Sequence, residues 1–185
     1  QGLNNRILKS IVKDTDGAPQ SIILQGPFGS GKTTSSRVLA KALNCETKGG
    51  EPCLTCETCQ EDIQNSPFYE EYDSAIVGNV NKIRELRDTF HLTISNSWKV
   101  IVFDEIHLAS RQAQSALLKV IEEAPVKVMF LFCTTNVDKI IPTIRSRSLE
   151  LRFKFISIKS SAIYILSIYK YLLYLLNIFC IFYII

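Results

Sequence analysis

The sequence predicts an α/β fold in which helices flank a parallel sheet. Three short apolar runs, each typical of a buried strand, alternate with segments whose apolar residues recur at helical spacing. A glycine-rich loop follows the first run and opens a helix, as a phosphate-binding loop does. Strands that alternate with helices indicate crossover connections, and these connections produce a parallel sheet.

Composition divides the chain, which has 185 residues and a formal net charge of +3. So small a charge gives no reason to expect a polyanionic partner. Residues 1–155 have the composition of a soluble cytosolic domain, whereas residues 156–185 contain no Asp, Glu, Arg, Gly or Pro. The chain opens on Gln1 without a signal peptide, which suggests a fragment whose start is missing.

The first elements lie before the cysteine-rich segment. Apolar residues at helical spacing predict a helix over residues 3–13, and a loop with Gly and Pro follows it. Residues 21–25 (SIILQ) form a buried strand, and residues 32–43 form the helix after the glycine-rich loop. Residues 44–60 are irregular because two glycines and a proline interrupt them.

The remaining elements lie between residue 61 and residue 146. We expect a short helix that closes before Pro67, a helix over residues 79–90 and a strong helix over residues 111–123. Residues 99–105 and 127–135 are apolar enough for two further buried strands. A short helix is predicted near Pro142–Ser146, and no internal repeat is present.

The segment from Gly26 to Thr33 fits the phosphate-loop pattern G-x-x-x-x-G-K-[ST]. Glycines allow backbone N–H groups to curl around a phosphate, and the helix N-terminus adds partial positive charge. Lys32 can reach the β- and γ-phosphate oxygens, and the Thr33 hydroxyl can bind Mg²⁺. The predicted nucleotide-binding residues are Gly26, Pro27, Phe28, Gly29, Ser30, Gly31, Lys32, Thr33 and Thr34. The bland alternative is a glycine turn before a helix.

Two adjacent acids end the second strand, where ligands of α/β proteins bind. Asp104 would hold Mg²⁺ through water, and Glu105 would polarise the attacking water. Both could instead be ordinary loop acids. His107 completes a DExH pattern, which leaves a helicase-style role and a capping or packing role open, and we expect the capping or packing role.

Four of the six cysteines lie close together, at Cys45, Cys53, Cys56 and Cys59. Two overlapping C-x₂-C steps suit a tetrahedral Zn²⁺ held by four thiolates, and such a closed site is structural. An iron–sulfur cluster uses similar spacings, and a disulfide framework is a third possibility that the lack of an export signal disfavours. Cys133 and Cys180 are expected to be apolar filler.

Taken in order, these pieces resemble one family over about residues 1–155. The phosphate loop, the cysteines after "ALN", "DEIHLASRQAQSALLKVIEEAP" and "CTTNVDKIIPTIRSRS" are similar to the AAA+ core of bacterial clamp-loader ATPases, the DNA polymerase III gamma/tau subunits. Related archaeal and eukaryotic subunits lack the cysteine insertion, and the delta-prime subunit typically has a degraded phosphate loop. The intact loop here therefore implies an ATP-binding subunit.

The resemblance also implies roles for residues outside the phosphate loop and the acid pair Asp104–Glu105. Thr135 falls at the sensor-1 position, which responds to the γ-phosphate, and Asn136 is the fallback. Arg147 falls at the arginine that acts in trans on the ATP of the adjacent subunit. Alternatively, Arg145 and Arg147 are simply solvated charges. Arg111 lies in a region that faces primer-template DNA in the family.

The family would continue after Phe155 into a helical lid and a collar, which this sequence lacks. Residues 156–185 instead form an atypical hydrophobic tail. A frame error or aberrant ending is the preferred explanation, and a membrane span or an apolar helix packed on the core are the alternatives.

The resemblance implies an ATP-hydrolysing subunit of a clamp loader that opens a sliding clamp and loads it onto primed DNA. Its cofactors would be ATP, Mg²⁺ and Zn²⁺, and its location the cytoplasm. Its partners would be other loader subunits in a hetero- or homo-oligomeric ring, the clamp and primer-template DNA, with no membrane unless the tail is genuine. The alternatives are a membrane-attached or helicase-like P-loop ATPase, and an inert product that only binds nucleotide and zinc.

Overall fold

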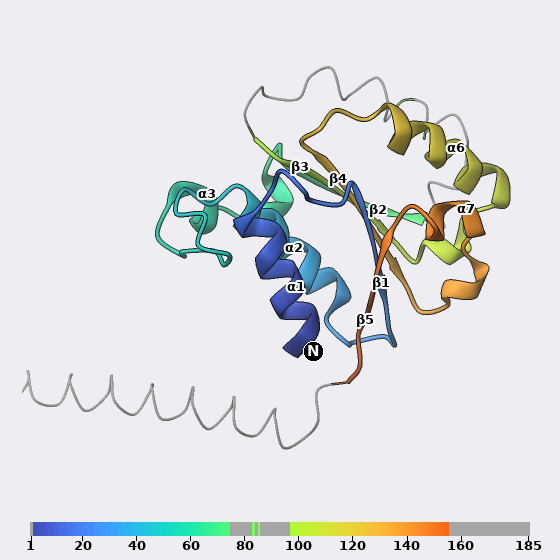
Figure 1. Cartoon of the computed structure of the whole chain (residues 1–185), viewed down its shortest axis with the longest axis horizontal. Coiled ribbons are helices and arrows are strands. Elements are labelled where there is room, and N and C mark those ends of the chain that lie inside the picture. Colours follow the sequence, from blue (N-terminus) through green and yellow to red (C-terminus); the bar gives the residue numbers. More distant parts are fainter. Residues whose placement is uncertain (1, 75–82, 84, 86–96, 156–185) are drawn as a thin grey trace, which may run out of the picture. The chain divides into compact units, whose positions relative to one another are not determined.

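A computed structural model describes residues 2–74, 83, 85 and 97–155 (Figure 1). Within these residues, five parallel strands form one sheet in the order β2-β3-β4-β1-β5. The strands are β1 (Ser21–Gln25), β2 (Tyr69–Asp73), β3 (Lys99–Asp104), β4 (Val128–Thr134) and β5 (Leu149–Arg152). The predicted α/β fold with a parallel sheet is confirmed.

The helices of the described part agree with most of the predicted ones. Its α-helices are α1 (Gly2–Lys13), α2 (Lys32–Leu43), α3 (Glu57–Gln60), α6 (Arg111–Glu123) and α7 (Pro142–Arg145). Its 3₁₀ turns are η1 (Ile63–Asn65), η3 (Ile106–Leu108) and η4 (Val137–Lys139). The α6 helix starts where expected because the Ser110 hydroxyl accepts a hydrogen bond from the Ala113 N–H.

Helices cover both faces of the sheet, with α1 and α2 on one face and α6 and α7 on the other (Figure 1). Side chains alternate across each strand, so Ile22 and Leu24 pack on the α1–α2 side and Ile23 packs on the α6–α7 side. All three of these side chains are fully buried. Burial on both faces explains why the central strands are continuous apolar runs.

Two strands and one helix were not predicted. The β2 strand (YEEYD) and the β5 strand (LELR) are the edge strands of the sheet, so their charged side chains reach solvent and hide the apolar pattern. The α3 helix lies inside the cysteine segment that was expected to be irregular. The helix predicted over residues 79–90 lies outside the described residues, except for Ile83 and Glu85.

Contacts divide the chain into two units, Gln1–Lys154 and Phe155–Ile185. Apart from Phe155, the second unit lies outside the described residues, so the boundary after residue 155 and the nature of the tail stay predictions. No helix in the described part of the chain is both long enough and apolar enough to cross a membrane.

Candidate nucleotide site and metal centre

The phosphate loop connects the end of β1 to the start of α2 and depends on three glycines. Gly29 and Gly31 have φ angles of 72° and 91°, the left-handed region in which a side chain is strained. Gly26 is required for space, because a Cβ there would lie 2.6 Å from the Phe153 carbonyl oxygen. The loop therefore has a sharp turn at Gly29 and Gly31 and a close approach to the backbone of Phe153 at Gly26.

Lys32 begins α2, and its side chain is 5% exposed. Its Nζ donates hydrogen bonds to the carbonyl oxygens of Gly26 at 2.8 Å and of Pro27 at 3.1 Å. The same ammonium lies 4.0 Å from Glu105 Oε1. The phosphate loop and the predicted acids at the end of β3 are thus brought together, with the lysine charge between them.

Asp104 ends β3 and Glu105 follows it in a left-handed conformation, with φ 48° and ψ 47°. Such a conformation is uncommon for a residue with a side chain, and strained residues of this kind are enriched at functional sites. The Glu105 N–H donates to Asp104 Oδ1 at 3.1 Å. Burial raises the pKa of the Asp104 carboxyl, and the hydrogen bond from Glu105 opposes that rise.

The tip of β4 supplies polar groups to Glu105. Thr135 donates to Glu105 Oε2 through its hydroxyl at 3.1 Å and its N–H at 3.3 Å. His107 Nδ1 lies 2.9 Å from the same oxygen and 3.1 Å from Thr134 Oγ1. The capping or packing role that was expected for His107 does not account for these two polar contacts. Thr134 was not predicted at all, although a buried threonine that ends an apolar strand could have indicated it.

A cavity of about 890 Å³ lies beside these acids, with Phe28 of the phosphate loop in its wall. Five acidic residues line this cavity: Glu70, Glu71, Asp73, Asp104 and Glu105. Glu70 pairs with Lys99 and Glu71 with Arg37, and the Lys32 ammonium lies 4.0 Å from Glu105. Hard oxygen donors such as the Asp104 carboxylate and the Thr33 hydroxyl are the ligands that Mg²⁺ prefers, and an acidic wall admits a polyphosphate best together with a divalent cation.

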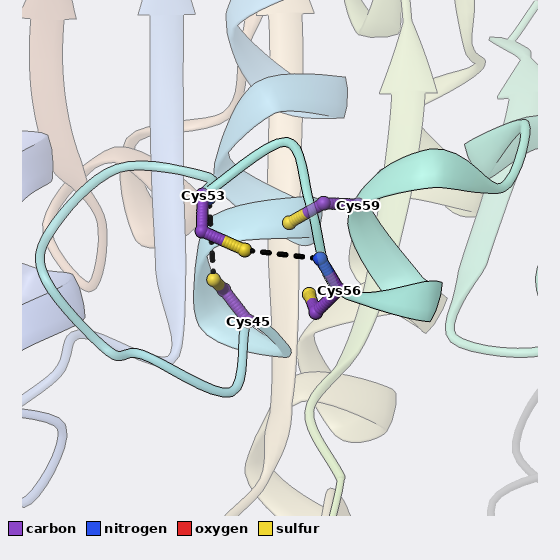
Figure 2. Close-up of side chains that lie close together, drawn as sticks. All are labelled: Cys45, Cys53, Cys56 and Cys59. Atoms are coloured by element: carbon purple, nitrogen blue, oxygen red, sulfur yellow. Dashed lines mark hydrogen bonds between the residues drawn. The ribbon is translucent and has the colours of Figure 1, made fainter.

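The four clustered cysteines meet in space as well as in sequence (Figure 2). Their sulfur atoms all lie within 4.8 Å of one another. Two backbone N–H groups donate to sulfur, Cys53 N to Cys45 Sγ at 3.4 Å and Cys56 N to Cys53 Sγ at 3.3 Å. Zn–S bonds of about 2.3 Å would place the sulfurs of a tetrahedron about 3.8 Å apart, so this set needs little movement to bind zinc.

The thiols of this cluster differ in acidity. Hydrogen bonds from Thr55 and Cys56 lower the pKa of the Cys53 thiol to about 5. Burial raises the pKa of the Cys59 thiol to about 12. All five cysteines in the described residues are free, so no disulfide forms among them. Cys133 is buried in β4, as expected for apolar filler.

The cysteine segment is attached to both neighbouring helices. Lys41 of α2 donates to the Cys59 carbonyl oxygen at 2.8 Å and to that of Glu61 at 2.6 Å. Lys9 of α1 pairs with Glu51 at 2.6 Å. The segment is thereby held against the helix that begins at the phosphate loop.

The ion pairs of Arg145 and Arg147 are with residues outside the phosphate loop. Arg147 pairs with Glu122 at 3.1 Å and donates to the Thr143 carbonyl oxygen, and its side chain is 48% exposed. Arg145 pairs with Glu150 and Asp138. Both arginines make partly exposed ion pairs, so the trans-acting role of Arg147 and the alternative of solvated charges both stay predictions. Arg111 opens α6 and lines a separate cavity of about 580 Å³ with His107 and Arg145.

Comparisons with known proteins all find subunits of DNA polymerase III. Residues 4–157 match the family described as "DNA polymerase III, delta subunit". The chain is 37% identical over 150 residues to "DNA polymerase III subunit gamma/tau" of Mycobacterium bovis, covering 78% of this chain and 26% of that protein. It is 42% identical over 138 residues to "DNA polymerase III subunit gamma" of Buchnera aphidicola from Schizaphis graminum, covering 73% of this chain and 38% of that protein.

A solved structure shares the fold. It is a DNA polymerase III gamma subunit-related protein from Thermotoga maritima, with a TM-score of 0.57 and 19% identity, covering 84% of this chain and 47% of that one. The chain therefore spans about a quarter to two fifths of the length of these two curated relatives and about half of the solved one.

Proposed function

Because the chain belongs to the DNA polymerase III delta-subunit family of clamp-loader proteins, we propose that it binds and hydrolyses ATP as a subunit of a DNA polymerase clamp loader. One observation carries this proposal. An intact phosphate loop, the acids after β3 and the polar tip of β4 meet at one edge of the sheet. An adaptor without nucleotide chemistry has no need of that arrangement.

Each residue of this edge has a role in hydrolysis. Lys32 exchanges its bonds to loop carbonyls for bonds to β- and γ-phosphate oxygens. Thr33 and Asp104 would hold Mg²⁺, and the ion would supply positive charge next to the phosphates. Glu105 acts as general base for the attacking water. Thr135 orients the Glu105 carboxylate by donating a hydrogen bond to it.

Arg147 completes the site of a neighbouring subunit. Its exposed guanidinium is bound by a single carboxylate, Glu122, so it can be redirected to another molecule. A planar guanidinium suits the charge that develops on a transferring phosphoryl group. The chain by itself is therefore a poor ATPase, and activity needs a ring of identical or different subunits.

The cysteine cluster serves as a structural zinc site. Four sulfurs within 4.8 Å leave no position for a substrate, as in closed zinc sites. The segment is bound to α2 through Lys41 in the last turn of that helix, so zinc would fix the segment at the end of the helix that is far from Lys32. An iron–sulfur cluster would give a coloured protein with visible absorption, which separates the two metals.

The whole loader would work in the cytoplasm on a sliding clamp and primer-template DNA. ATP binding would close the ring around the clamp, and hydrolysis would release the clamp onto DNA. Arg111 at the start of α6 would contact a DNA phosphate. The family description names a delta subunit, but the intact phosphate loop supports a gamma-type subunit that binds ATP.

The test is ATP hydrolysis by the protein assembled with its partner subunits. Joint stimulation by the clamp and a primed DNA template supports the proposal, and Arg147→Ala should abolish that stimulation without changing nucleotide affinity. The matched control is Arg145→Ala, which removes a nearby guanidinium. Stimulation by duplex unwinding substrates or by lipid vesicles would instead show the helicase-like or membrane-attached alternative.

A further inference from the structure

The His107 imidazole joins the ends of two neighbouring strands. Its Nδ1 lies 2.9 Å from Glu105 Oε2, after β3, and 3.1 Å from Thr134 Oγ1, which ends β4. The side chain is 11% exposed, so water competes little for these contacts. The predicted roles of capping and packing do not require any contact with a carboxylate.

The partners of this ring determine where its proton lies. An ionised carboxylate only accepts hydrogen bonds, so Nδ1 must carry the hydrogen that it shares with Glu105. The Thr134 hydroxyl oxygen already accepts the Asn136 N–H at 3.0 Å, and it can accept from the same Nδ1–H. The contacts therefore place a hydrogen on Nδ1 of His107, as in the Nδ1–H tautomer.

The two oxygens of Glu105 have different surroundings. Oε2 accepts from the Thr135 hydroxyl at 3.1 Å, from the Thr135 N–H at 3.3 Å and from His107 at 2.9 Å. Oε1 lies 4.0 Å from the Lys32 ammonium, on the side of the phosphate loop. One oxygen is thus occupied by fixed donors, and the other faces the place where phosphates would bind.

We propose that His107 is a positioning residue that fixes Glu105 Oε2, so that Oε1 is the oxygen that accepts the proton of the attacking water. The water oxygen then bonds to the γ-phosphorus, the proton goes to Oε1, and the bond from that phosphorus to the bridging oxygen of ADP breaks. The inference rests on the proposed ATPase function. It adds a specific role for a histidine that contacts Glu105 and Thr134.

The first test measures the tautomer without any nucleotide. The chain contains two histidines, so labelling histidine with ¹⁵N and comparison with a His91→Gln variant assign the ring nitrogens by NMR. We expect His107 to be in the Nδ1–H form in the wild type and to shift toward the Nε2–H form in Glu105→Ala. An Nε2–H form in the wild type, or a tautomer indifferent to Glu105, would overturn the proposal.

The second test separates positioning from folding in the assembled ATPase. His107→Phe keeps the ring but removes the donor, and should lower kcat about tenfold to a hundredfold with nucleotide affinity unchanged. His107→Asn keeps an N–H donor and should recover most of that loss. The His107→Phe effect should vanish when Glu105 is Gln, because both changes remove the same step.

The two proposals fail differently in this experiment. A wild-type assembly that hydrolyses no ATP would refute the proposed function and this inference together. An active assembly in which His107→Phe retains the wild-type kcat, or in which His107→Asn is as slow as His107→Phe, would refute the inference alone.

Discussion

The two sites of this molecule are built in opposite ways. The cysteine cluster takes its four ligands from residues 45–59, within a single stretch of chain. The nucleotide site takes its groups from three separate segments, around residues 26–33, 104–107 and 134–136. Only the sheet, in which β1, β4 and β3 are neighbours, brings those segments together.

This difference decides what each site depends on. A local cluster is stabilised by its metal and loses its structure when one ligand is lost. A site assembled at a sheet edge rests on an apolar core beneath it, so its polar side chains can be changed while the apolar contacts of the core stay in place. The two sites should therefore respond to mutation independently, even though α2 connects them.

Loss of a cysteine ligand should give the largest effect. Cys59→Ser should abolish zinc binding and lower the free energy of unfolding by about 4 kcal/mol or more, because three remaining thiolates cannot close the site. Metal analysis and thermal melting measure the two outcomes. Cys133→Ala is the control, since that cysteine is buried in β4 and should leave the zinc content unchanged. Full zinc content in Cys59→Ser would contradict a four-cysteine site.

Removal of the phosphate-loop lysine should weaken nucleotide binding without affecting zinc binding. Lys32→Ala should weaken ATP binding about a hundredfold, because it deletes a charge-assisted contact to phosphate, while zinc content stays intact. Calorimetric titration measures the affinity. Lys41→Ala on the same helix is the matched control, because Lys41 binds the Cys59 and Glu61 carbonyls. Equal loss of ATP affinity in both variants would show that the sites are not independent.

A methyl group at Gly26 should disturb the loop through its backbone. Gly26→Ala would place a Cβ 2.6 Å from the Phe153 carbonyl oxygen, and we expect it to lower the free energy of unfolding by about 2 kcal/mol. Urea denaturation measures the change. Gly17→Ala meets no atom within 4 Å and should be neutral or slightly stabilising. Equal stability of the two variants would show that the backbone of Phe153, just after β5, does not restrict the loop.

A change of pH should have the smallest effect, and it should act on zinc binding. Zinc must displace the proton of Cys59, whose pKa is about 12, but not that of Cys53, whose pKa is about 5. Protons therefore compete with zinc throughout the neutral range, and lowering the pH from about 8 to about 7 should weaken zinc binding at least about tenfold. Competition with a chromogenic chelator measures this. An affinity that stays constant between these pH values would contradict a protonated Cys59.

The sequence predicts those parts of the sites that lie close together in the chain. The phosphate loop and the cysteine cluster are complete in short motifs, and the apolar runs of β1, β3 and β4 reveal their burial. The edge strands were missed because charged residues interrupt their apolar pattern. The contact between His107 and Thr134 was missed because it joins the η3 turn after β3 to the end of β4, and no local pattern encodes the adjacency of these two strands.

Strand order also has a consequence for synthesis on the ribosome. Because β1 lies between β4 and β5, residues 21–25 emerge first but cannot gain both neighbours until residue 152 has been made. The cysteine cluster, in contrast, is complete once residue 59 has left the exit tunnel. A zinc ion could therefore anchor the growing chain while most of the sheet is still untranslated, and the nucleotide pocket would be among the last features of the nascent domain to form.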